Sequence, residues 1–442
     1  MTDEMTPQDE QNAEAGAVAT KALEETKIIT ARFDKDRSLD AYVADGGYGA
    51  LRKALAMDPG ELIDLIKESG LRGRGGAGFA TGAKWSFIPK DVRPSYLVCN
   101  ADEGEPGTFK DRELMERDPH QLIEGMAIGA HAIGSREMVI FVRGEFAYAA
   151  RVLEQAAAEA YAKGYLGKDV MGTGESLDLI IHRGAGAYIC GEETALLEAI
   201  EGRRGQPRLR PPFPAIQGLY AKPTVVNNVE TFACVPHIVN NGPDWFKGFG
   251  TEKSPGTKMF CLSGDVERPG NYEVPFGTTA RELIEGFAGG VKGGKTLKAF
   301  TPGGASSTPF FAADKLDVNM DWESVQAAGS LLGTGAIIVF AEDACMVRAA
   351  LRYTRFYAHE SCGKCTPCRE GTFWLEKILH RFENGQGREE DLKIGNDVAG
   401  NIIGRSFCAL GDFSIAPITS TTALFRDEYM AHIKNKGCPF AR

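Results

Sequence analysis

The sequence predicts an α/β domain with a mainly parallel sheet, followed by a last third that is almost entirely helical. Short apolar segments alternate with helical patterns over the first half of the chain, which is typical of helices layered on a parallel sheet. After a strand at 336–340, the apolar spacing is helical to the end. With 442 residues, the chain is too long for one hydrophobic core, and two to four domains are expected.

The elements of the first half are predicted in order. The first thirty residues hold seven acidic and two basic residues and few large apolar ones, so we expect a disordered extension or a segment wrapped on a partner. Leu62, Leu65 and Ile66 give the spacing of a helix that ends at Gly70. The next elements are expected to be a strand at 96–99, a helix at 113–133, a strand at 138–142, a helix at 146–163, a strand at 177–182 and a helix ending near 202.

The middle of the chain predicts a loop and then a small β-plus-α unit. Residues 203–228 are rich in Pro and Arg, and so long an irregular segment is more often a functional loop than a plain connection. Strands at 259–264 and 272–274 and a helix at 279–287 form the small unit, which reaches to about residue 320. We expect no chemically active residues in it.

Composition excludes several function classes. The net charge of −10 disfavours nucleic acid as the main partner, since phosphate binding needs a basic surface. No run approaches 18 apolar residues, and the N-terminus carries no basic-then-apolar signal. The ten cysteines are scattered except for one cluster, which fits a reducing compartment and a metal site. We therefore expect a bacterial-type cytoplasmic protein.

The cysteine cluster is the clearest functional motif. Cys362, Cys365 and Cys368 stand at a spacing of three, as in the bacterial ferredoxin run that binds an iron–sulfur cubane. A helix is expected from about Glu370, and its N–H groups, with nearby cations, can stabilise thiolates. The alternative is a structural zinc site with His359 as a further candidate ligand, although zinc sites usually pair two separated C-x2-C knuckles.

The fourth ligand of this cluster must come from elsewhere in the chain. The free candidates are Cys345, Cys408 and Cys438. Cys408 lies in a break between two helical stretches and can point inward, whereas Cys345 looks like part of a helix face and Cys438 sits in a polar tail.

A glycine loop at 71–85 predicts an anion site. Gly73, Gly75 and Gly78 formally match the dinucleotide fingerprint, but a helix rather than a strand precedes them, so an ordinary Rossmann turn is not expected. Backbone N–H groups without side chains still form a concave anion site, and Arg74 and Lys84 add charge for a phosphate. The alternative is a tight structural turn.

Polar residues follow two predicted strands. The turn Asn100-Ala-Asp102-Glu103-Gly-Glu105 lies beyond one strand's carboxyl end, where open α/β sheets bind ligands. Such groups can hold ribose hydroxyls or the polar edge of a flavin; the alternative is a solvated loop. The same pattern recurs with Tyr188, Glu192 and Glu193, and the pair Asn227-Asn228 is either polar ligands or a turn and cap. Phe79, Phe87 and Phe213, taken alone, favour core positions over stacking surfaces for an adenine.

Together these segments resemble one family, the NADH-binding flavoprotein subunit of respiratory complex I, the proton-pumping NADH:quinone oxidoreductase, of bacterial type. The resemblance covers roughly residues 60–435. It is carried by the segments at 70–79, 99–103, 186–195, 210–214, 227–231, 360–371 and 404–408.

The resemblance implies an architecture. The expected parts are a modified Rossmann-like FMN domain, a ubiquitin-like, soluble-ligand-binding-like β-grasp domain and a C-terminal helical bundle with the iron–sulfur cluster. The corresponding boundaries are 1–30 for the acidic extension, 31–250 for the FMN/NADH part, 251–335 for the β-grasp part and 336–442 for the helical part.

The resemblance also implies cofactors and site residues. FMN would be bound by Gly73, Gly75, Gly76, Lys84, Asn100, Asp102, Gly191, Glu192, Asn227 and Asn228, with Arg74 and Glu103 adjacent in the same motifs. NADH would lie against Phe79, Phe87 and Phe213 at its adenine and Glu105, Tyr188 and Glu193 at its nicotinamide. The [4Fe–4S] ligands would be Cys362, Cys365, Cys368 and Cys408.

The implied activity is hydride transfer from NADH to FMN, with no protein acid or base, followed by single-electron transfer to the cluster. The implied partners are a thioredoxin-like [2Fe–2S] subunit and a large iron–sulfur subunit, on the cytoplasmic side of the bacterial inner membrane. Two alternatives stay open: a diaphorase subunit of an NAD-linked hydrogenase or formate dehydrogenase, and a zinc-stabilised scaffold without redox activity.

The chain departs from the family pattern at two positions. Ala80 stands where many relatives have Pro, which would loosen the loop slightly. Arg210 stands where some relatives carry Lys, and either cation could face a nucleotide phosphate, although Arg does so as a planar fork.

Overall fold

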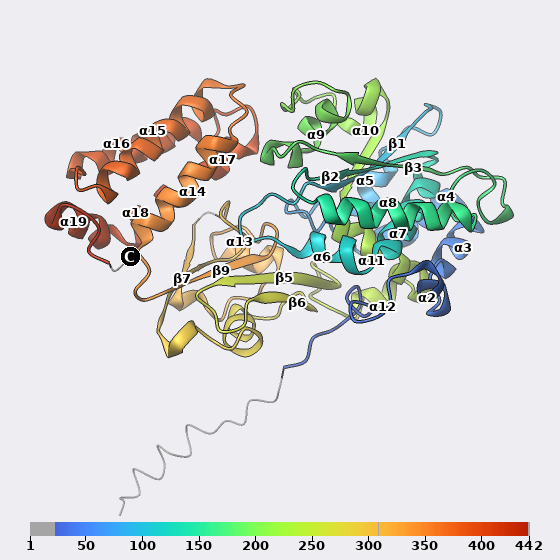
Figure 1. Cartoon of the computed structure of the whole chain (residues 1–442), viewed down its shortest axis with the longest axis horizontal. Coiled ribbons are helices and arrows are strands. Elements are labelled where there is room, and N and C mark those ends of the chain that lie inside the picture. Colours follow the sequence, from blue (N-terminus) through green and yellow to red (C-terminus); the bar gives the residue numbers. More distant parts are fainter. Residues whose placement is uncertain (1–22, 308, 441–442) are drawn as a thin grey trace, which may run out of the picture.

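The computed structural model describes residues 23–307 and 309–440, which form two sheets and a helical C-terminal region (Figure 1). The first sheet is parallel throughout, in the order β3-β2-β1-β4. Its strands are β1 (Tyr96–Ala101), β2 (Glu137–Val142), β3 (Asp178–Arg183) and β4 (Thr224–Asn228). Because all four strands run the same way, their carboxyl ends meet at one edge.

Strand β4 was not predicted, because residues 203–228 were expected to be irregular throughout. Its first three residues, Thr224, Val225 and Val226, are β-branched and buried, and they pair with β1. The pairing sets Asn100 beside Asn228 at the edge of the sheet. Because Pro-rich residues precede this short apolar run, it was interpreted as part of the irregular segment.

Helices cover the first sheet. They are α2 (Leu39–Ala44), α3 (Gly49–Leu55), α4 (Pro59–Glu68), α5 (Thr81–Ser86), α6 (Lys110–Arg117), α7 (Pro119–Ile133), α8 (Ala147–Ala162), α9 (Glu193–Ile200), α10 (Pro214–Gln217), α11 (Val229–Asn241) and α12 (Pro243–Lys247). The one helix expected at 113–133 is two, α6 and α7. The helix breaks at Asp118 because Pro119 has no N–H and begins α7 as its first residue.

The second sheet has the order β6-β5-β9-β7-β8. Its strands are β5 (Thr257–Gly264), β6 (Gly270–Pro275), β7 (Leu297–Thr301), β8 (Phe311–Ala312) and β9 (Ala336–Ala341), with a π-helix at Glu282–Phe287 and α13 at Trp322–Ala327. Strand β9 lies in the middle of this sheet, between β5 and β7. The expected boundary at 335 is therefore wrong, since it separates a central strand from its own sheet.

The segment before α2 is tied to the second sheet. The backbone N–H groups of Ile28, Ile29 and Thr30 donate to the buried carboxylate of Glu273 on β6, at 2.9–3.1 Å. The expectation of a disordered extension is thus wrong for these residues, because three N–H donors and a carboxylate satisfy one another. Residues 1–22 lie outside the described part of the chain.

The remainder is helical, as predicted, and gathers on one side of the molecule (Figure 1). The helices are α14 (Met346–Glu360), α15 (Thr366–Glu383), α16 (Glu389–Ile402), α17 (Ala409–Ser414), α18 (Ala416–Leu424) and α19 (Arg426–Asn435). Helix α15 begins within the cysteine motif rather than near Glu370, because Pro367 suits its first turn. Within the described ranges, no helix is both long and apolar enough to cross a membrane.

Candidate functional site: two adjoining cavities and a cysteine pocket

The glycine loop folds back on itself between α4 and α5. Gly73 N–H donates to the Phe79 carbonyl at 2.8 Å, and Thr81 N–H donates to the Leu71 carbonyl at 2.8 Å. Gly78 has φ +63°, and a Cβ there would lie 2.6 Å from the Trp322 indole nitrogen. The loop therefore needs glycine for its backbone conformation and for its close packing against Trp322. Trp322 belongs to the second domain, which is the part of the chain from 257 to 341 that forms the second sheet.

Two cavities adjoin at this loop. The glycine-loop cavity has a volume of about 870 Å³, and the carboxylate cavity has a volume of about 530 Å³. Their shared lining residues are Gly75, Gly76, Ala77, Asn100, Gly191, Glu192 and Asn228. The two cavities therefore adjoin at these residues.

The predicted site residues line these cavities almost without exception. The glycine-loop cavity adds Gly73, Phe79, Lys84, Phe87, Glu193, Arg210, Phe213 and Asn227. The carboxylate cavity adds Asp102, Glu103, Glu105 and Tyr188. Residues from 73 to 228 are brought together because the carboxyl ends of β1 and β4 and the loop after β3 meet at one edge of the sheet.

Arg74 is the exception among these residues. Its side chain is fully buried, and its guanidinium donates to the carbonyls of Arg72, Pro255 and Thr257 at 2.6–3.1 Å. The expectation that Arg74 adds charge for a phosphate is wrong for this structure. Its guanidinium instead fastens the glycine loop to the start of the second sheet.

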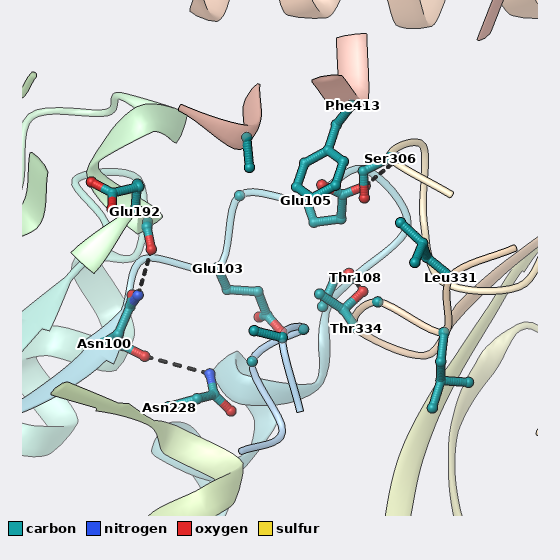
Figure 2. Close-up of a pocket in the computed structure, with 18 of the residues that line it drawn as sticks. Asn100, Glu103, Glu105, Thr108, Glu192, Asn228, Ser306, Leu331, Thr334 and Phe413 are labelled. Atoms are coloured by element: carbon teal, nitrogen blue, oxygen red, sulfur yellow. Dashed lines mark hydrogen bonds between the residues drawn. The ribbon is translucent and has the colours of Figure 1, made fainter. Parts of the chain in front are cut away.

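Amide groups form the polar rim between the cavities. Asn100 Nδ2 donates to the Gly191 carbonyl at 2.7 Å, and Asn228 Nδ2 donates to Asp111 at 2.7 Å. Asn228 Nδ2 also donates to the Asn100 carbonyl at 3.5 Å (Figure 2). Behind them, Trp85 Nε1 donates to Asn227 Oδ1 at 2.9 Å. These bonds fix the amide orientations at the mouth of the shared region.

Among the carboxyl groups that line the carboxylate cavity, those of Asp102, Glu103 and Glu105 are buried. Burial raises the pKa of Asp102 to about 7 and that of Glu103 to about 7. Glu105 accepts from Tyr188 Oη at 2.7 Å and from Ser306 N–H at 2.8 Å, and burial raises its pKa. The cavity can thus change its charge close to neutral pH.

Two cations stand in the glycine-loop cavity. Lys84 Nζ donates to the Val226 carbonyl at 3.0 Å and lies 3.3 Å from Glu193. Arg210 lies 3.3 Å from Glu193 and 3.7 Å from Glu192. Both cations are partly exposed and paired with carboxylates that an incoming phosphate can replace.

The three phenylalanines are exposed, which contradicts their interpretation as core residues. Phe79, Phe87 and Phe213 are 50%, 53% and 57% exposed, although all three line the glycine-loop cavity. Apolar rings left open to solvent around a cavity provide stacking surfaces for a planar ligand.

Two observations fit an FMN in these cavities. The glycine backbone and Lys84 suit a phosphate. The residues Asp102 and Trp322 line the carboxylate cavity, and Asp102 Oδ2 and Trp322 Nε1 are buried without a hydrogen-bond partner among the described residues. The exposed rings beside the glycine loop suit a second, nucleotide ligand.

The cysteines Cys362, Cys365, Cys368 and Cys408 line a third, small pocket. Cys365 precedes the first residue of α15 and Cys408 precedes α17, so helix N-termini face the thiols. Cys345 and Cys438 are not part of this pocket. The side chains of Ile189 and Leu410 line both this pocket and the carboxylate cavity.

The four thiols are not gathered as closely as the ligands of a single zinc ion in this structure. Within residues 23–307 and 309–440, the one group of three or more His, Cys, Asp or Glu side chains with ligand atoms within 4.8 Å of one another includes none of the four. His359 is 83% exposed in its side chain and contacts Glu360 instead. Four thiols spread around a pocket suit a larger cluster such as a cubane.

Several lining residues were missed by sequence reasoning. They come mainly from residues 306–334: Ser306, Trp322, Gln326, Ser330, Leu331, Leu332, Gly333 and Thr334. Of these, Ser306 lies in the small unit that was expected to carry no chemically active residues. Others include Thr108, Lys110, Asp111 and Phe413. No local motif marks them, because they reach the cavity through contacts between domains.

Models of known families match three parts of the chain. The Nuo51 FMN-binding domain matches residues 66–237, an SLBB domain matches 258–339, and the NADH-ubiquinone oxidoreductase-F iron-sulfur binding region matches 348–432. These matches define a flavin-binding, iron–sulfur electron-transfer protein, with FMN and a [4Fe–4S] cluster as its cofactors.

Curated relatives specify the family. The F subunit of NADH-quinone oxidoreductase from Streptomyces coelicolor is 58% identical over 93% of this chain and 92% of its own length. The Mycobacterium tuberculosis protein of the same name is 56% identical (96% and 97% covered), and that of Salmonella typhimurium is 47% identical (93% and 94%). The chain belongs to the family of NADH-quinone oxidoreductase F subunits.

A solved structure shows the same fold. The crystal structure of NAD+-reducing [NiFe]-hydrogenase in the air-oxidized state matches with a TM-score of 0.80 and 36% identity, over 97% of this chain and 70% of that chain.

Proposed function

We propose that this chain oxidises NADH in the glycine-loop cavity and passes the electrons, through FMN, to the cysteine pocket. The observation that carries the proposal is the shared wall: Ile189 and Leu410 line both the carboxylate cavity and the cysteine pocket. A flavin held in the first and a cluster held in the second would be separated by little more than these side chains.

Different side chains would bind different parts of FMN. The glycine loop and Lys84 would hold the FMN phosphate, and Asn100, Asn228 and Glu192 would hold its ribityl chain. Asp102 would face the flavin ring.

NADH would enter from the open side of the glycine-loop cavity. Its adenine would stack on Phe79, Phe87 or Phe213, and Arg210 would face its phosphates. Glu105, Tyr188 and Glu193 would surround the nicotinamide end.

The chemistry needs little else from the protein. When bound, FMN supplies a two-electron acceptor that releases electrons one at a time. The residues that line the two cavities would bind and orient the flavin and the nicotinamide. Cys362, Cys365, Cys368 and Cys408 would ligate the [4Fe–4S] cluster that receives the electrons.

A second function, NADH oxidation within an NAD-linked hydrogenase, is supported by the hydrogenase structure that shares this fold. The identity to that structure is 36%, against 47–58% for the curated relatives named above. Membership of NADH:quinone oxidoreductase is therefore the better supported function.

The assembly and division of the chain follow as proposals. We expect a thioredoxin-like [2Fe–2S] subunit and a large iron–sulfur subunit as partners, on the cytoplasmic side of the bacterial inner membrane. The FMN part, a modified Rossmann-like fold, would end near 250, and the β-grasp part would run from 251 to 341, so that it keeps β9.

The test uses the purified chain after anaerobic reconstitution with FMN, iron and sulfide. We expect flavin absorbance and NADH-dependent reduction of ferricyanide. A chain that binds neither FMN nor NADH under these conditions contradicts the proposal.

A further inference from the structure

A second group of metal-binding side chains lies at the far end of the helical region. Cys345 precedes α14, Glu383 is the last residue of α15, His432 lies in α19, and Cys438 follows α19. Cys365 and Glu383 bracket the length of α15, so this group is about 27 Å from the cysteine pocket along the helix axis.

The four ligand atoms are gathered closely. Cys345 Sγ lies 3.5 Å from His432 Nε2 and 3.5 Å from Cys438 Sγ, and His432 Nε2 lies 3.5 Å from Glu383 Oε2. All four atoms lie within 4.8 Å of one another. The edges of a tetrahedral zinc site with sulfur, nitrogen and oxygen ligands are about 3.3–3.8 Å, so the three measured separations are of that size.

The histidine is oriented as a ligand. His432 is fully buried, and its Nδ1 lies 2.7 Å from the Glu428 carbonyl, which can only accept. Nδ1 therefore carries the proton, and in the neutral ring Nε2 presents a lone pair to the two sulfurs and the carboxylate. A hydrogen bond from Nδ1 to a carbonyl is the arrangement that orients metal-ligating histidines.

The carboxylate points into the same space. Glu383 Oε1 accepts from Arg348 Nε at 2.8 Å, whereas the buried Oε2 has no hydrogen-bond partner and faces His432. Two lone-pair atoms facing each other in a buried site are stabilised by a shared proton or by a cation between them.

We propose that Cys345, Glu383, His432 and Cys438 bind a structural Zn²⁺ ion, separate from the iron–sulfur cluster. Two thiolates, one imidazole and one carboxylate form a closed tetrahedral set with no open position, as structural zinc sites do. Two thiolates and a carboxylate give Zn²⁺ an excess negative charge. Arg348, whose Nη2 lies 3.0 Å from Cys438 Sγ, balances that charge.

The ion would fasten the C-terminal segment. Helix α19 and the residues after it contact α14, α15 and α18 in the helical core, and the zinc would join α19, Cys438, α14 and α15 at one point. The bundle that presents the cysteine pocket would thereby be held closed at its opposite end.

The experiment measures zinc and iron in the anaerobically purified holoprotein by elemental analysis, together with the zinc X-ray absorption spectrum. We expect about one Zn and about four Fe per chain. The zinc shell should contain two sulfurs and two lighter atoms. The variants C438S and H432Q should each lose at least roughly tenfold of the zinc while keeping iron and FMN.

Cys365→Ala is the matched control, because it should lose iron and keep zinc. Four outcomes overturn the proposal: no zinc even after incubation with equimolar Zn²⁺; equal zinc in wild type and C438S; a zinc shell of four sulfurs, which places the ion in the cysteine pocket; or a Cys345–Cys438 disulfide in peptide mapping. Because the two variants alter different elements, misfolding of one leaves the other as the test.

Discussion

Lys84 sets the positive charge at the glycine loop. Among the described residues, its ammonium contacts the Val226 carbonyl and Glu193, so it is available to a phosphate. A charge-assisted hydrogen bond contributes about 1.5–3 kcal/mol. We therefore expect Lys84→Met to weaken FMN binding by roughly 10–100-fold, measured by flavin fluorescence on reconstitution, whereas Lys90→Met, at an exposed lysine outside the cavities, should bind as wild type. Equal affinities of the two variants would contradict the phosphate assignment.

Phe79 tests the stacking surface. Removing a ring that stacks on an adenine costs about 1–3 kcal/mol. Phe79→Ala should therefore raise the KM for NADH by roughly 5–100-fold while leaving flavin content unchanged. Phe373→Ala removes a ring of similar exposure on α15 and serves as the control. If F79A lost FMN instead, the ring would belong to the flavin site.

Asp102 predicts a pH dependence of stability. Burial raises its pKa to about 7 in the folded chain, above the value of about 3.9 in an unfolded one. The folded state therefore holds a proton that the unfolded state has lost, and stability falls as pH rises from about 4 to 7. Asp102→Asn should remove this loss and stabilise the flavin-free protein by about 2–4 kcal/mol at pH 8.

At pH 4.5 the same substitution should stabilise the chain by only about 1 kcal/mol, because this pH lies less than one unit above the pKa of Asp102 in the unfolded chain. Thermal unfolding of wild type and D102N at the two pH values measures the difference. Asp91→Asn, at an exposed carboxylate, is the control. A D102N chain that gains no stability between the two pH values would show that Asp102 is not buried as described.

At the scale of elements, the glycine loop and the strand ends make the site. Gly78→Ala would force a Cβ into the Trp322 ring at a positive φ, so we expect about 1–3 kcal/mol of destabilisation and reduced flavin retention. Gly49→Ala, where a Cβ meets nothing within 4 Å, should be nearly neutral. Thermal unfolding and bound flavin after gel filtration measure both effects, and a neutral G78A would exclude the close contact.

Many of the strands and loops around the site could be predicted from the sequence. The strands β1, β2 and β3 are predicted by continuous apolar runs. The glycine motif and the cysteine motif each predict the loop in which they lie. The break before Pro119 was missed although a proline that begins a helix is visible in the sequence. The short strand β4 could not be predicted, because its pairing with β1 is decided by the sheet. Arg74 shows the same limit: its charge suggests a ligand, but two of the carbonyls that bind it are 181 and 183 residues away in the chain.

At the scale of the molecule, the cavities lie between domains. Trp322, Ser306 and the loop at 331–334 reach the site from the second domain, and Phe413 and Leu410 reach it from the helical region. These contacts join residues far apart in the chain and follow no local pattern. The sequence therefore predicts the motifs of the site but not the residues that close it.

The shared wall of Ile189 and Leu410 ties the flavin cavity to the cysteine pocket and carries the central claim. Anaerobic titration of the reconstituted chain with NADH, followed by optical absorption and EPR, tests it most directly. The account predicts that flavin absorbance bleaches and that a reduced [4Fe–4S] signal appears in wild type, while Cys365→Ala bleaches without that signal. A chain that holds FMN and iron but whose flavin is not bleached by NADH would contradict it.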